Sequence, residues 1–104
     1  MALTRDFKQT VLARAKRDPK FRQALFTEAI NAYLTGDIAT GKAMLRDLIN
    51  ATIGFEQLAL EVKKPSKSLH RMLAPGGNPN TENFFGILSA LQRQTKVRLS
   101  VSAH

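Results

Sequence analysis

The chain has 104 residues and no cysteine, and its 16 Lys and Arg against 8 Asp and Glu give a formal net charge of +8. This length suits one compact domain over residues 1–104, and 43% hydrophobic residues are enough to build its core. The lack of cysteine excludes a disulfide framework and a cysteine-ligated zinc site, and it suits a reducing cytoplasm. We expect neither a signal peptide nor a membrane span, because no apolar run approaches the ~18 residues that a span needs.

The basic residues are unevenly distributed along the chain. Residues 1–22 carry seven of them against two acids, whereas residues 23–62 carry two against five acids. Residues 63–71 carry four bases, and no acid lies between Glu61 and Glu82. A positive balance favours a polyanionic partner such as nucleic acid. The N-terminal cluster is typical of a solvated helix face, but the cluster at 63–71 coincides with a structural motif.

Apolar spacing and capping residues predict helices in the first half of the chain. Residues 1–18 are expected to form a basic helix or arm, with Phe7 and Ala15 on one face. Asp18 and Pro19 are then a typical N-cap and first helical residue. We therefore expect the basic segment to end where a second helix begins.

Residues 19–53 are expected to contribute two supporting helices. The first runs to about Leu34, before Gly36, a residue that commonly ends helices. Asp37 is the predicted N-cap of the next helix, which runs to about Ala51 with its apolar residues on one stripe.

Residues 54–74 contain two short apolar-periodic segments joined by a polar break, which predicts a helix-turn-helix. This motif places its second helix in the DNA major groove. After the small Ala59 the motif requires apolar residues at fixed offsets, and they follow three, ten and thirteen positions later, at Val62, Leu69 and Met72.

The turn of this motif contains Lys63, Lys64 and Pro65. Most such motifs have glycine where Lys63 stands. We therefore expect a left-handed backbone at Lys63, which costs a residue other than glycine about 1–2 kcal/mol.

Residues 75–80 form a dense turn signal rich in glycine, asparagine and proline. A further helix is expected over residues 81–95, capped by Asn80 or Thr81. The loop therefore marks the end of the helix-turn-helix and the start of the last helix.

Residues 97–102 alternate apolar and polar side chains, which predicts a half-buried β-strand. A lone strand leaves its N–H and C=O groups unpaired, and no second strand-like run is visible in the chain. The economical interpretation is a homodimer in which Val97, Leu99 and Val101 pair with the same strand of a second copy. The alternative is a tail that docks on the helices or frays.

The second helix of the motif supplies the predicted DNA-binding residues. Lys67 and Arg71 are expected to contact bases or phosphates, because both side chains donate to guanine edges and to phosphate oxygens. Ser66 and Ser68 are expected to make contacts near the DNA backbone, and His70 to contact DNA or solvent. The candidate phosphate contacts outside this helix are Lys63, Lys64 and the loop residue Asn78 with its neighbouring glycine backbone.

The chain resembles the addiction-module antidote proteins, antitoxin-like regulators in the lambda-repressor-like helix-turn-helix superfamily. The likeness covers roughly three quarters of the chain from about Leu25. It rests on these residues: Ala29, Tyr33, Leu34, Gly36, Asp37, Leu58, Ala59, Ser66, Ser68, Leu69, Met72, Leu73, Gly77, Asn78, Pro79, Ala90, Leu91 and 97–101. The resemblance implies DNA binding and autoregulation of an operon that encodes a toxin partner. The chain departs from these relatives in its basic N-terminus and in residues 92–96, where they have a shorter glycine turn.

The expected fold is all-α: a lambda-repressor-like helix-turn-helix bundle of five or six helices with a short C-terminal β-strand. The expected function is sequence-specific binding of double-stranded DNA by a cytoplasmic, nucleoid-associated transcriptional regulator. Two alternatives stay open, a protein-interaction module that binds an acidic toxin or polymerase surface, and a basic amphipathic protein on anionic membranes.

Catalysis is not expected. Histidine occurs only at positions 70 and 104, and no acid close in the sequence orients His70 as a triad would require. Metal ligands are too scattered for a metal site, and no glycine-rich phosphate loop follows a strand, so we expect no cofactor.

Overall fold

This computed structural model describes residues 5–104, with side chains from Gln9 onward, and these residues contain six helices. The predicted count of five or six helices and the all-α class are confirmed. The helices are α1 (Arg5–Arg17), α2 (Pro19–Leu34), α3 (Ile38–Ala51), α4 (Gly54–Val62), α5 (Ser66–Met72) and α6 (Thr81–Thr95). None of these helices combines the length and apolarity that crossing a membrane requires.

The predicted N-caps of α2, α3 and α6 are confirmed. The Asp18 carboxylate accepts hydrogen bonds from the backbone N–H groups of Phe21 and Lys20, and these bonds help to lower the pKa of Asp18. The side chain of Asp37 caps α3 at 3.3 Å, and that of Asn80 caps α6 at 2.8 Å. Each cap satisfies a backbone donor that the first turn leaves without an intrahelical partner, so the polar residues define where the helices start.

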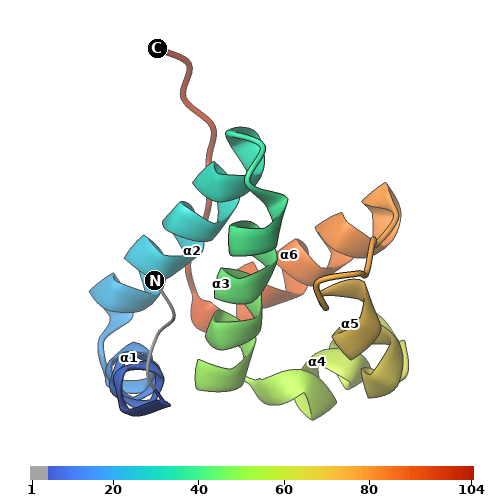
Figure 1. Cartoon of the computed structure of the whole chain (residues 1–104), viewed down its shortest axis with the longest axis horizontal. Coiled ribbons are helices and arrows are strands. Elements are labelled where there is room, and N and C mark those ends of the chain that lie inside the picture. The colour runs from blue at the N-terminus through green and yellow to red at the C-terminus, as the bar shows by residue number, and fades with distance from the viewer. Residues whose placement is uncertain (1–4) are drawn as a thin grey trace.

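Two helix groups share one core (Figure 1). α1, α2 and α3 pack against one another, and α4 then contacts α3, α5 and α6. The largest fully buried side chains come from α2 through α6 and the residue that follows α5: Phe26, Leu45, Leu48, Ile49, Leu58, Leu69, Leu73, Ile87 and Leu91. The predicted face of α1 is confirmed at Ala15, which is fully buried, whereas the side chain of Phe7 lies outside the described residues.

Gly41 allows α2 and α3 to approach closely. A Cβ added at Gly41 would lie 2.6 Å from the Tyr33 ring and 3.1 Å from the Ala29 carbonyl oxygen. The Tyr33 ring also contacts Phe84 of α6, with ring centroids 4.8 Å apart. Burial raises the pKa of Tyr33, and its hydroxyl has no hydrogen-bond partner among the described residues. The contact between the Tyr33 and Phe84 rings joins the α2–α3 pair to α6.

The predicted C-terminal strand is wrong for the described chain, because residues 97–104 form no strand. Val97 is buried, Leu99 is half-buried, and the Leu99 N–H donates to the Gln92 side chain at 2.8 Å. Residues 97–99 therefore pack against the helices through Val97 and Leu99. A single chain supplies no neighbouring strand, and Val101 remains 89% exposed.

Candidate nucleic-acid interface

The turn between α4 and α5 has the predicted left-handed residue. Lys63 adopts φ 56° and ψ 45°, and the N–H groups of Lys63 and Lys64 both point to the carbonyl oxygen of Ala59. Pro65 is extended at φ −62° and ψ 142°, and α5 starts at the next residue. Proline fixes its own φ and cannot continue the preceding helix, so the chain changes direction here.

α5 buries one side and exposes the other. Leu69 and Leu73 are 1% and 0% exposed and belong to the core, with Met72 packed beside them. Lys67 and Arg71 are four residues apart, so they project from the same side of the helix, and both are exposed. The side of α5 that points away from the core therefore carries two cations.

Two contacts fasten α5 to α4. The Ser66 hydroxyl donates to the Glu56 carboxylate at 3.1 Å. The His70 ring stacks on Phe55, with ring centroids 3.9 Å apart and planes 20° apart. One face of the imidazole is therefore covered by an aromatic side chain of the core, while the residue remains exposed at its edge. Both residues were predicted as DNA contacts, and the structure gives each a contact within the protein.

The end of α5 is held from α3. Arg46 donates a hydrogen bond to the carbonyl oxygen of Leu73, and Lys42 donates one to the carbonyl oxygen of Gly77. These carbonyls lie at a helix end and in a loop, where the backbone lacks intrahelical donors. We call this pair of contacts the α3 clamp. Lys42 is only 6% exposed, so its ammonium group is not part of the basic surface of the protein.

The loop after α5 is shaped by Gly77. Its N–H donates to the Ala74 carbonyl at 2.8 Å, and a Cβ at this position would lie 1.7 Å from the Arg71 carbonyl oxygen. Only glycine lets the loop return so closely over the end of the helix. The next residue, Asn78, is exposed on the same loop.

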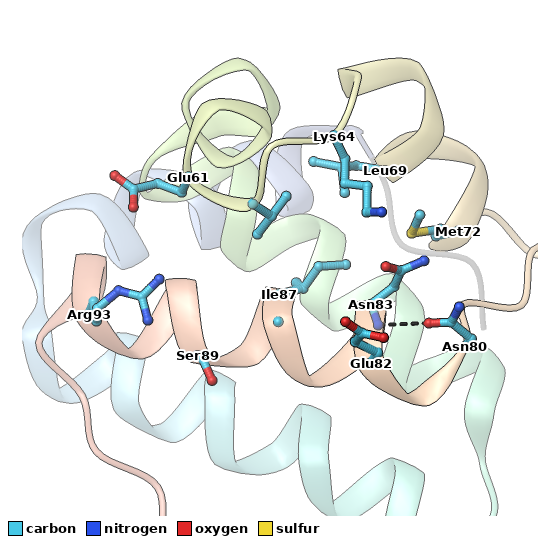
Figure 2. Close-up of a pocket in the computed structure, with 12 residues that line it drawn as sticks. Glu61, Lys64, Leu69, Met72, Asn80, Glu82, Asn83, Ile87, Ser89 and Arg93 are labelled. Carbon is cyan, nitrogen blue, oxygen red and sulfur yellow. Dashed lines mark hydrogen bonds between the residues drawn. The ribbon is translucent and has the colours of Figure 1, made fainter.

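A cleft of about 470 Å³ is lined by residues of α4, α5 and α6 (Figure 2). Val62, Leu69, Met72 and Ile87 line its apolar part. The Lys64 side chain extends over the cleft toward Asn83 of α6. Lys64 therefore lines this cleft, although the residue is exposed.

The predicted DNA contacts therefore divide into two groups. Three cations, Lys63, Lys67 and Arg71, are exposed at the turn and on α5, and no ion pair within residues 9–104 engages Lys63 or Lys67. Ser68 lies next to this group, because the Arg71 guanidinium reaches its hydroxyl at 3.5 Å. Of the other predicted residues, Ser66 and His70 contact α4 and Lys64 lines the cleft. Asn78 is exposed on the loop after α5.

Sequence reasoning missed the residues that position α5. Lys42 and Arg46 were counted only as two bases in an acidic stretch, and Glu56 only as one of its acids. Their spacing was the available signal, because Lys42 and Arg46 lie four residues apart and so share one side of α3. The spacing could not identify their acceptors, which are carbonyls far along the chain.

Comparison of the chain with protein-family models, curated proteins and solved structures finds no match. The geometry of α4, α5 and their surroundings therefore carries the functional argument.

The left-handed lysines provide a matched pair for testing the turn. Lys63 and Lys96 have nearly equal φ values of 56° and 57°, at the ends of α4 and α6. Because glycine adopts this conformation without strain, we expect Lys63→Gly and Lys96→Gly each to raise the free energy of unfolding by about 1 kcal/mol. Urea denaturation measures both. A loss of stability in Lys63→Gly alone would show that its side chain makes a stabilising contact.

The α3 clamp predicts a local loss of stability. Lys42→Met and Arg46→Met remove the donors to the Gly77 and Leu73 carbonyls, so we expect each to lower the free energy of unfolding by about 1–3 kcal/mol. Amide hydrogen exchange should accelerate at Ala74 and Gly77 in both variants. The control is Lys20→Met at an exposed site, which should change stability by less than about 0.5 kcal/mol. Unchanged exchange at the loop in the clamp variants would contradict this role.

Proposed function

We propose that this chain is a sequence-specific double-stranded DNA-binding regulator that inserts α5 into the major groove. The observation that carries the proposal is the outward side of α5, where Lys67 and Arg71 project together from a helix fastened on its inner side. The proposal includes a lambda-repressor-like arrangement, in which α4 and α5 are the helix-turn-helix and the remaining helices support it.

The dimensions of α5 support this proposal. An α-helix with its side chains, such as α5, is about 10–12 Å in diameter. The DNA major groove is about 12 Å wide and accepts an α-helix. Its outer side chains would then face base edges, where Arg and Lys donate to the O6 and N7 atoms of guanine.

The fixed position of α5 also supports DNA recognition. Base contacts need donors placed within a few tenths of an ångström, and a helix that moved would lose them. The Ser66–Glu56 bond, the His70–Phe55 stack and the α3 clamp hold α5 at its start, middle and end. We assign these residues a positioning role, and we keep Lys63 and Asn78 as the candidate phosphate contacts on either side.

The resemblance to antidote proteins adds a biological role to the proposal. We infer an antitoxin-like autorepressor whose operon encodes a toxin. The neighbouring reading frame tests this part separately, because a small toxin-like gene beside this one is expected for an antitoxin and not for a stand-alone regulator.

DNA binding is tested by selecting bound duplexes from a random pool and then titrating the selected duplex by fluorescence anisotropy. We expect Lys67→Ala and Arg71→Ala each to weaken binding about tenfold or more, because a good base contact contributes about 1–3 kcal/mol. Binding should also weaken steeply with salt, since phosphate contacts release counterions.

The matched controls are Lys16→Ala and Lys20→Ala, which remove one exposed charge each from α1 and α2. We expect them to change the affinity by less than about twofold. Equal losses in all four variants would indicate a general charge effect and contradict recognition by α5. Failure to enrich any sequence, together with retention of an acidic protein partner, would favour the protein-interaction alternative.

A further inference from the structure

Residues of α2, α3, α6 and the loop after α5 line a small groove of about 240 Å³. Three aromatic side chains belong to its lining, those of Tyr33, Phe84 and Phe85. The Phe84 ring lies 4.8 Å from Tyr33 and 5.6 Å from Phe85, centroid to centroid. Phe85 and Ile38 line the groove while 58% and 40% exposed, so its apolar wall is open to solvent. We call it the aromatic groove. A concave, mostly apolar lining with a few polar groups is typical of small-molecule sites.

The aromatic groove also contains a buried cation without a counterion. Lys42 lines the groove and is only 6% exposed. Its ammonium group has three N–H donors, and one of them goes to the carbonyl oxygen of Gly77. No carboxylate lines the groove, and Lys42 forms no ion pair within residues 9–104. Burying a charge costs free energy unless an opposite charge compensates it, so the groove favours an anion.

A second polar group in the wall of the groove lacks a partner. The hydroxyl of Tyr33 is buried and makes no hydrogen bond to any described residue. Buried hydroxyls are nearly always paired, so this one is an available donor for a ligand oxygen. Tyr33 and Lys42 line the same groove, and one ligand there can contact both residues.

We propose that the aromatic groove binds a small aromatic carboxylic acid as its anion. The carboxylate lies against the ammonium group of Lys42, and the aromatic ring lies against Phe84 and Phe85. The size agrees, because a cavity of about 150 Å³ accommodates benzene and the larger groove has room for a carboxylate as well. A polyanion such as a nucleic acid does not suit this site, because Lys42 is the one cation that lines it.

The ligand acts on the loop after α5. Lys42 holds the carbonyl oxygen of Gly77 in this loop, and the loop residues Asn78 and Pro79 line the groove. A carboxylate uses donors of Lys42 that the Gly77 carbonyl leaves free, so both contacts exist together. The ligand therefore immobilises Lys42 and strengthens the α3 clamp. By linkage, it also strengthens DNA binding by α5, and this last consequence alone rests on the proposed function.

Amide NMR of the full chain without DNA, titrated with benzoate at constant ionic strength, tests the site. We expect saturable shift changes at Lys42, Asn78 and Phe85, and slower amide hydrogen exchange at Gly77. Benzamide, a neutral compound of the same shape, should bind at least about tenfold more weakly, because it lacks a charge-assisted hydrogen bond to Lys42. Acetate should also bind at least about tenfold more weakly, because it has the charge but no ring to bury.

Phe85→Ala tests the apolar wall without touching the α3 clamp. It should weaken benzoate binding about fivefold or more, because the ligand ring loses an apolar contact. Phe85 is exposed, so we expect the variant to keep the wild-type helix content in circular dichroism. The matched control is Leu60→Ala, which truncates a side chain on α4 that is 73% exposed and should leave the affinity for benzoate unchanged.

The site would be overturned by an absence of saturable shift changes, by equal affinity for benzamide or acetate, or by a folded Phe85→Ala variant that binds benzoate like the wild type. An equal loss in Leu60→Ala would overturn it as well. Unchanged exchange at Gly77 in the benzoate complex would contradict the action on the loop. None of these readouts uses DNA, so a chain that binds benzoate and enriches no duplex would contradict the proposed function and leave the site standing.

Discussion

A helix of seven residues cannot maintain its shape alone in water, so the position of α5 depends on contacts from outside it. Leu69 and Leu73 anchor its inner side in the core. Arg46 supplies a donor at its last turn, and Lys42 fastens the loop that follows. Lys67 and Arg71 on the outward side of α5 are exposed and not part of the core, so their side chains are available to a ligand.

This arrangement divides the basic residues into two classes. The cations of the α3 clamp point inward and donate to backbone carbonyls, whereas those on α5 point outward without acidic partners on their own helix. The net charge counts the cations of both classes equally and does not show which of them are exposed to a ligand. The structure separates them because a buried cation needs acceptors around it, and free backbone carbonyls at a helix end provide these.

The sequence predicted the parts of the fold that depend on local chemistry. The caps at Asp18 and Asp37 and the left-handed Lys63 follow from interactions within a few residues. The α3 clamp could not be predicted, because its donors and acceptors lie 27 and 35 residues apart. The strand over residues 97–102 was predicted wrongly because alternation reports which side chains face inward and not whether a neighbouring strand exists. The sequence indicated the outward residues of the candidate site, Lys67 and Arg71. It did not indicate the contacts of Ser66 with Glu56 and of His70 with Phe55, which lie within the protein.

The most direct test of the account is an amide NMR titration of the full chain with a selected DNA duplex. Recognition by α5 predicts that chemical-shift changes concentrate at residues 63–71 and at the loop around Asn78. The residues of α1 should change little. Shift changes centred on α1, or spread evenly over all basic surfaces, would contradict insertion of α5 into the major groove.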